Sequence, residues 1–214
     1  AYLEVTATAP HELTLWANLV RFPGAPPLVA VDATYLGDEP GARELMRAFD
    51  QIAGLVSDSR AMMPVSRLGT ITAEPEDPSP GLGQGALLAG LDEAAIKSLL
   101  AGPLDPLVSV QIRHVGGALS HGSDIPPGPV SEPYSIFMLG LPLNPEVTAA
   151  VPARQAELVA ALGEHVTGRK VLNLLVPGDS AAVAFPPEAL SRLRQIKRQR
   201  DPDGTLRGSY PVLD

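Results

Sequence analysis

Polar side chains recur at every second position of the segment 107–115, and apolar residues occupy most of the positions between them. In a β-strand, alternate side chains point to opposite faces, so one face would carry Ser109, Gln111 and Arg113. An amide and a guanidinium can bind a polar ligand, but neither is a good base at pH 7, because one is neutral and the other stays protonated. Two interpretations fit this face: a ligand-binding surface, or a solvated side of an antiparallel sheet.

His114 is the residue of this segment whose ordinary pKa suits proton transfer. The alternation places it on the apolar face with Val110 and Ile112, where a hydrogen-bonded core histidine is the simpler interpretation. No pair among the four histidines has a metal-binding spacing such as His-Glu-x-x-His, although His114 and His121 flank one loop. We expect no metal site.

The elements that would position these side chains alternate between strands and helices. The periodicity predicts strands at 29–35, 107–115, 134–141 and 170–176, and helices at 92–100, 153–166 and 187–199. The proline-rich segments 74–85 and 121–133 are predicted loops. A further helix is expected to begin after Asp38, with an apolar stripe formed by Leu45, Met46, Phe49, Ile52, Ala53 and Val56. This order of elements predicts an α+β fold.

Composition limits the classes of function. The chain has 214 residues, of which 45% are hydrophobic, enough for one substantial core. A net charge of -8 argues against nucleic acid and anionic membranes as partners, because both would repel it. The chain has no cysteine, which excludes disulfides and thiol catalysis. No stretch is long and apolar enough to span a bilayer, and no signal peptide is recognisable, so we expect a cytoplasmic protein.

Two segments carry motifs of a known family. The first is a helix with Arg192-Leu193 and Lys197, followed by Asp201-Pro202 and Arg207; the second is the segment 107–119, which contains Gly116-Gly117. Together with the segment 8–16, they resemble FAD-linked oxidases of the berberine bridge enzyme type, within the vanillyl-alcohol-oxidase superfamily. The resemblance implies an antiparallel β-sheet with helices packed on one face. It also implies a substrate-binding domain at 1–170, truncated at its N-terminus, and a C-terminal segment at 171–214 that returns to the FAD domain.

The resemblance implies roles for particular residues. Gln111 and Arg113 would face the substrate, and Tyr134, on a neighbouring strand, would be a wall or phenolic partner, which makes these three the catalytic candidates. Asn173 would contact the flavin, and Ser209 and Tyr210 in the tail would be further cofactor contacts. The sequence departs from the family at position 171, where valine replaces a tyrosine, and at the tail, where Ser209 or Tyr210 stands at the family's asparagine position.

The chain lacks the family's FAD domain. It has neither the glycine-rich Arg-Ser-Gly-Gly-His type of loop nor a cysteine to attach a flavin. We therefore expect a fragment of an FAD-dependent oxidoreductase, inactive without an N-terminal FAD-binding half. That enzyme would transfer a hydride from a small organic substrate, such as a sugar, alcohol or secondary metabolite, to the flavin, with O₂ as acceptor. The alternative is a non-catalytic, stand-alone α+β domain that binds a ligand or forms a homodimer.

Overall fold

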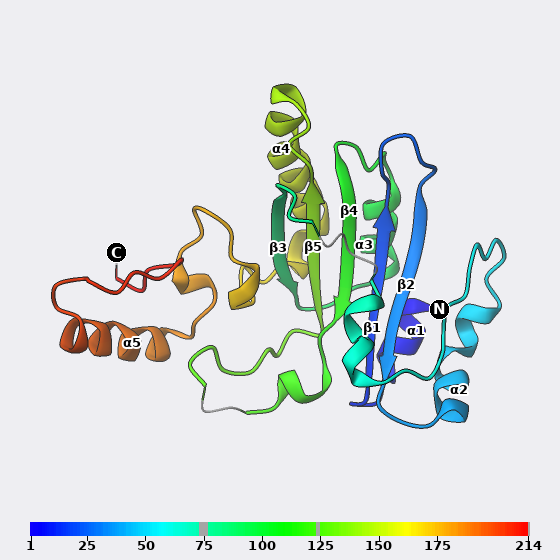
Figure 1. Ribbon diagram of the computed structural model, residues 1–214, viewed down its shortest axis with the longest axis horizontal. Coiled ribbons are helices and arrows are strands. Elements are labelled where there is room, and N and C mark those ends of the chain that lie inside the picture. The colour runs from blue at the N-terminus through cyan, green and yellow to red at the C-terminus, as the bar shows by residue number, and fades with distance from the viewer. Residues whose placement is uncertain (73–76, 123–124, 214) are drawn as a thin grey trace.

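Five antiparallel strands form one sheet in the computed structural model, which describes residues 1–72, 77–122 and 125–213. The strands lie in the order β2-β1-β4-β5-β3, so that β4 is central (Figure 1). Their bounds are β1 Leu13–Val20, β2 Leu28–Tyr35, β3 Leu82–Leu88, β4 Leu107–His114 and β5 Tyr134–Gly140. The predicted strands at 29–35, 107–115 and 134–141 are confirmed as β2, β4 and β5.

Four helices cover one face of this sheet: α1 Tyr2–Ala7, α2 Glu39–Asp50, α3 Glu93–Leu100 and α4 Pro145–Leu162. The fifth helix, α5 Pro187–Arg200, lies with the C-terminal residues beyond β3 and away from the sheet (Figure 1). Short 3₁₀ helices complete the chain: η1 Val65–Thr70, η2 Gly117–Ser120, η3 Gly163–His165, η4 Leu172–Leu174 and η5 Ala181–Val183. The architecture is α+β with helices on one face, as the sequence indicated.

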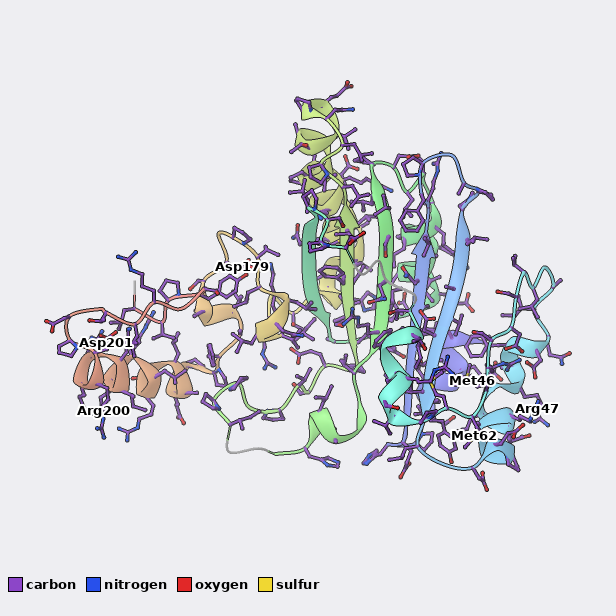
Figure 2. All side chains as sticks on the ribbon, viewed as in Figure 1. Met46, Arg47, Met62, Asp179, Arg200 and Asp201 are labelled. Carbon is purple, nitrogen blue, oxygen red and sulfur yellow. The ribbon has the colours of Figure 1, made fainter. Side chains whose placement is uncertain are left out.

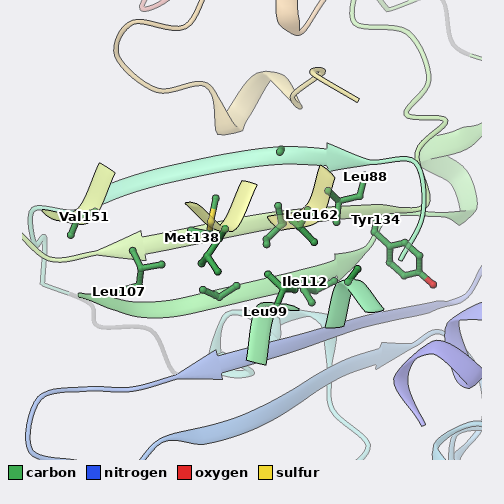
Figure 3. Close-up of a cluster of buried hydrophobic side chains, with 13 residues drawn as sticks. Leu88, Leu99, Leu107, Ile112, Tyr134, Met138, Val151 and Leu162 are labelled. Atoms are coloured by element: carbon green, nitrogen blue, oxygen red, sulfur yellow. The ribbon is translucent and has the colours of Figure 1, made fainter. Parts of the chain in front are cut away.

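The core lies between the sheet and these four helices. Its larger part joins β3, β4 and β5 to α3 and α4, with Ile136, Met138 and Val151 wholly removed from solvent (Figure 3). A smaller cluster joins β1 to α1 and α2 through Leu15 and Met46. Burying one aliphatic side chain of this size contributes about 1.5–3 kcal/mol, so the helix-covered face carries most of the stability of the fold.

Side-chain caps fix where three of the helices begin. The Asp38 carboxylate accepts a hydrogen bond from the Gly41 N–H at 2.9 Å, and the Asp92 carboxylate accepts one from Ala95 at 2.7 Å. Asn144 caps α4 in the same way, accepting from Val147 at 2.9 Å. Each cap satisfies an N–H that the helix itself leaves unpaired and contributes about 1 kcal/mol. The helices expected after Asp38 and at 92–100 therefore begin where they were predicted.

The structure corrects several sequence-based boundaries. α2 ends at Asp50 with Gln51 as its C-cap, so the apolar stripe does not continue to Val56, and Gly54 beyond it has a left-handed φ of 83°. α4 begins at 145 rather than 153 and keeps Pro152 inside the helix. The predicted strand at 170–176 is wrong, because η4 occupies its centre. The helix expected at 187–199 is confirmed as α5.

Apart from the 3₁₀ helices, one α-helix and two strands were not predicted. These are α1, β1 and β3, and β3 replaces the end of the expected loop 74–85. Part of that loop, 74–76, lies outside the described residues, as do 123 and 124 of the expected loop 121–133. The rest of 121–133 contains no helix or strand, as predicted. None of the helices in the described part of the chain is both long and apolar enough to cross a membrane.

Candidate functional site

The sheet face that α1–α4 leave uncovered, here called the open face, carries a row of side chains from all five strands. In the strand register, Trp16 on β1 lies opposite Asp32 on β2 and Arg113 on β4. Arg113 in turn lies opposite Ser135, which pairs with Leu87 on β3. Because cross-strand partners lie on the same face, the row runs across the whole sheet.

Two contacts hold the guanidinium of Arg113 in place on the open face. Its central carbon lies 4.8 Å from the centroid of the Trp16 ring, which is within cation–π range. Its Nε–H donates a short hydrogen bond to the side-chain oxygen of Gln111. A cation fixed by a ring and an amide is preorganised to meet an electron-rich group of a ligand.

A second row lies beside the first. Gln111 pairs with Asn18 and with Phe137, and only 6% of Gln111 is exposed. Asn18 also accepts a hydrogen bond from the Ser109 hydroxyl at 2.7 Å. The structure therefore brings Ser109, Gln111 and Arg113 together on one face, as predicted, and the burial of Gln111 does not fit a face that is simply solvated. Their catalytic or binding role stays a prediction.

The first row contains two charged residues, one at its β2 end and one at its centre. Within the five strands, Asp32 is the one acidic residue and Arg113 the one arginine or lysine. Asp32 is half-buried, and burial raises the pKa of its carboxyl above the ordinary value of 3.8. The sequence reasoning missed both Asp32 and Trp16. Asp32 faces away from the apolar alternation of its own strand, but its neighbours on the open face depend on β1, which was not predicted.

Two candidates lie on the other side of the sheet. Tyr134 packs in the helix-covered core, where its hydroxyl lies 2.7 Å from that of Thr6. His114 pairs with Tyr134, with the two rings 5.8 Å apart, and burial lowers the pKa of its imidazole below 6.5. The structure thus places His114 on the core side, as expected. It does not bring Tyr134 to Gln111 and Arg113.

The burial of this core corner also affects a second tyrosine. Tyr2 on α1 donates a hydrogen bond to the carbonyl of Ile112 at 3.1 Å. Burial, with the neighbouring Tyr134, raises the pKa of the Tyr2 phenol far above its ordinary value. The Tyr2 phenol is therefore a neutral hydrogen-bonding group of the core.

Asn173 lies near the β3 side of the open face. It belongs to η4, and the side chain of its neighbour Leu174 packs against Gly85, so closely that a Cβ added to Gly85 would lie 3.2 Å from it. Gly85 pairs with Phe137 in the second row. The Asn173 side chain is exposed. The structure thus carries Asn173 to the edge of the open face without packing it into the core.

The tail residues Ser209 and Tyr210 fold back along the C-terminal part. Tyr210 donates a short hydrogen bond to the carbonyl of Leu175, whereas Ser209 is exposed. Asp179 and Asp201 hold this part together, away from the sheet (Figure 2). The Asp201 carboxylate accepts hydrogen bonds from the N–H groups of Thr205 and Leu206, and its ion pair with Lys197 lowers its pKa.

An ion pair with one buried partner, Glu132, joins this C-terminal part to the sheet. Glu132 is 6% exposed and accepts hydrogen bonds from Arg169 at 2.9 and 3.2 Å and from the Thr167 hydroxyl at 3.1 Å. Next to the joint is a cavity of about 230 Å³ whose lining includes Leu87 of the first row and residues of 118–130 and 169–172. The cavity is mostly apolar, which suits the carbon skeleton of a small molecule.

Across the described residues, no group of three or more His, Asp or Glu side chains comes close enough to hold an ion. The open face offers neutral amides, a hydroxyl and a fixed guanidinium, with one carboxylate at its β2 edge and an apolar cavity at its β3 edge. Such a face can orient a small organic molecule and exchange hydrogen bonds with it.

No protein-family model matches the sequence, and no curated protein does. Solved structures do match in fold. One is 6-hydroxy-D-nicotine oxidase from Arthrobacter nicotinovorans, with a TM-score of 0.77 and 19% identity over 99% of this chain. Another is wild-type BBE-like 1 from Physcomitrella patens, with a TM-score of 0.71 and 15% identity over 100% of this chain. Phl p 4, a grass pollen allergen with glucose dehydrogenase activity, matches with a TM-score of 0.66 and 14% identity over 99%.

The chain covers 50% of each of these three proteins. Its α+β fold, an antiparallel sheet with helices, is therefore found within about half of each of these proteins. At these identities the likeness shows the fold. The resemblance inferred from the sequence motifs is therefore confirmed for the fold.

Proposed function

We propose that this chain is the substrate-binding and C-terminal portion of an FAD-dependent oxidoreductase that oxidises a small organic substrate, with O₂ as electron acceptor. The observation that carries the proposal is the polar, ordered open face. Gln111 and Arg113 are held by each other and by Trp16 on the side of the sheet that α1–α4 leave uncovered. Solved proteins with this fold are oxidases and a dehydrogenase, which supports the reaction class.

The residues present fit a flavin ring better than its phosphates. The open face combines amide and guanidinium donors with the half-buried rings of Trp16 and Phe137, a surface suited to a flat ring edged with nitrogens and carbonyls. The sequence contains no glycine-rich loop for a pyrophosphate. An N-terminal FAD-binding half would therefore hold the phosphates, and this chain would cover the ring.

Within that arrangement, each side chain has a limited task. Gln111 and Arg113 would orient the substrate by hydrogen bonds, and the cavity beside Leu87 would take up its apolar part. Asn173, Ser209 and Tyr210 are proposed to contact the cofactor. When bound, the flavin supplies the redox chemistry by accepting a hydride, and the protein supplies position and electrostatics.

The first test is the intact mass and the visible absorption spectrum of the native gene product. We expect a parent protein of about twice this length that absorbs in the flavin bands, because the solved relatives are about twice as long. In that protein, Asn173→Leu should lower flavin retention during dialysis. Gln199→Ala, at an exposed position of α5, is the control and should leave retention unchanged.

A colourless native product of this length, indifferent to a coexpressed FAD-binding half, would overturn the proposal. It would favour the stand-alone domain, whose oligomeric state would then be the next measurement. A flavoprotein in which Asn173→Leu retains flavin as well as the control would keep the reaction class and remove Asn173 from the cofactor site.

A further inference from the structure

Asp32 has no obvious structural task on the open face. Its strand neighbours Val31 and Ala33 pack into the core, so its own side chain points to the opposite side. In the part of the chain that the structure describes, the carboxylate makes no hydrogen bond and no ion pair. A half-buried carboxylate without a partner is unfavourable, because burial removes water that it would otherwise bind.

The other charged group of the row does not satisfy Asp32. Arg113 donates to Gln111 and stacks on Trp16, and Trp16 stands between Asp32 and Arg113 in the strand register. The row therefore presents a carboxylate on β2, an indole on β1 and a guanidinium on β4. A cation placed beside Asp32 would neutralise the carboxylate and lie next to an aromatic ring, a combination that protein sites for ammonium groups use.

We propose that Asp32, with Trp16 as its wall, binds a protonated amine of the substrate at the β2 end of the open face. The inference rests on the proposed function and names its substrate class: a small organic ammonium compound rather than a neutral alcohol or sugar.

The test uses the one tryptophan of the chain as its reporter. Because Trp16 pairs directly with Asp32, a ligand bound there changes the tryptophan emission. The chain is titrated at pH 7 with cyclohexylammonium, and separately with cyclohexanol as the neutral counterpart. We expect the ammonium compound to reach half-saturation at about a tenfold lower concentration, equivalent to about 1.4 kcal/mol.

Variants separate charge from shape. Asp32→Asn and Asp32→Ser should bring the two ligands within about twofold of each other, which corresponds to less than about 0.5 kcal/mol. Asp32→Glu should keep the preference for the cation, because it keeps the charge. Asp203→Asn is the matched control at an exposed aspartate of the tail, and it should behave as the wild type.

Equal binding of the two ligands by the wild type, saturable binding of neither, or a preference that survives in both uncharged variants would overturn the inference. These outcomes are distinct from failure of the proposed function, which is read from flavin absorption. A flavoprotein that binds the two ligands equally would support the proposed function and contradict the amine site. A colourless chain that prefers the ammonium ligand would support the cation site and contradict the proposed oxidoreductase function.

Discussion

Gln111 shows how one buried amide organises the open face. It is 6% exposed, and its side-chain oxygen accepts the hydrogen bond from Arg113. A hydrogen bond to a charged group contributes about 1.5–3 kcal/mol, and solvent near Arg113 reduces this figure. The amide therefore both stabilises the sheet and aims the guanidinium.

Gln111→Ala is expected to lower the free energy of unfolding by about 1–2 kcal/mol, because it removes this acceptor and leaves Arg113 without its bond. Urea denaturation followed by circular dichroism measures the change. Gln195→Ala is the matched control: Gln195 also accepts from an arginine, Arg192, at 2.7 Å, but on the exposed side of α5. The control should change stability by less than about 0.5 kcal/mol. Equal effects of the two variants would contradict the role given to burial.

Asp32 makes stability depend on pH in a defined direction. Its folded pKa is raised above 3.8, so in the window just above 3.8 the folded state binds the proton more strongly than the unfolded state. The resulting contribution to the free energy of unfolding is fully present below pH 3.8 and is lost as pH rises through the raised pKa. At pH 7 the ionised carboxylate is a cost to the fold.

Asp32→Asn should therefore be more stable than the wild type at pH 7, and the difference should shrink as pH falls toward 3.8. Unfolding free energies of both proteins at a series of pH values give this difference, and the titrations of other groups cancel in it. Asp201→Asn should show the opposite sign at pH 7, because Lys197 lowers the pKa of Asp201. A pH-independent difference between wild type and Asp32→Asn would rule out the burial effect.

The elements differ in how far the sequence predicts them. α3 and α5 have clear ends, and β4 and β5 have β-branched or aromatic residues in their cores. β1 is hard to recognise, because Trp16 and Val20 on the open face interrupt the alternation of Leu13 and Leu15. β3 reads as a loop, because its open-face positions 83 and 85 are glycines.

Those two glycines are explained by contacts that only the folded chain reveals. A Cβ on Gly83 would lie 2.8 Å from the ring of Phe137, and one on Gly85 would meet Leu174 of η4. Part of the candidate site could likewise be predicted and part could not. Alternation along one strand places Ser109, Gln111 and Arg113 together, whereas the neighbours Trp16 and Asp32 depend on pairing between strands distant in sequence.

The contact between α4 and β5 depends on another glycine, Gly140. A Cβ there would lie 2.4 Å from the nearest methyl carbon of Val151, which is fully buried. Gly140→Ala is expected to cost about 1–3 kcal/mol, because the helix must shift away from the sheet. In the double variant with Val151→Ala, we expect about 1 kcal/mol of this loss to be recovered relative to the sum of the single changes.

Thermal or urea unfolding of the four proteins in this double-mutant cycle provides the measurement. Gly69→Ala is the control, since nothing lies within 4 Å of the added Cβ, and its effect should stay below about 0.5 kcal/mol. Strict additivity of Gly140→Ala and Val151→Ala would show that the two residues do not limit each other.

For the molecule as a whole, the pair of Glu132 and Arg169 joins the sheet to the C-terminal part. Glu132 is the buried partner and Arg169 is 37% exposed. Removing the cation leaves a buried carboxylate without its counter-charge, whereas Glu132→Gln leaves a neutral amide that can still bond Thr167. The two changes should therefore differ in size.

Arg169→Leu is expected to destabilise the protein by about 1–3 kcal/mol, more than Glu132→Gln does. It should also speed hydrogen exchange at the amides of Leu87 and Thr167. The Leu87 amide donates to the carbonyl of Arg169, and the Thr167 amide donates to the carbonyl of Leu87. Mass spectrometry measures the exchange at both amides. Arg198→Leu, an exposed position on α5, serves as the control and should leave these amides protected. Unchanged protection in Arg169→Leu would mean that backbone pairing alone holds the joint.

The same joint affects which edge strand of the sheet can pair with a further strand. The amide of Leu87 donates to the carbonyl of Arg169, and that of Thr167 donates to the carbonyl of Leu87, so the chain itself occupies the Leu87 end of the outer edge of β3. No strand of the described chain pairs beyond β2, where Leu28 and Val29 are exposed. A sheet with two free borders can add copies without limit, but one with a single free border can pair only once. Within the described chain, a further strand can therefore add at β2, whereas the Leu87 end of β3 is already paired.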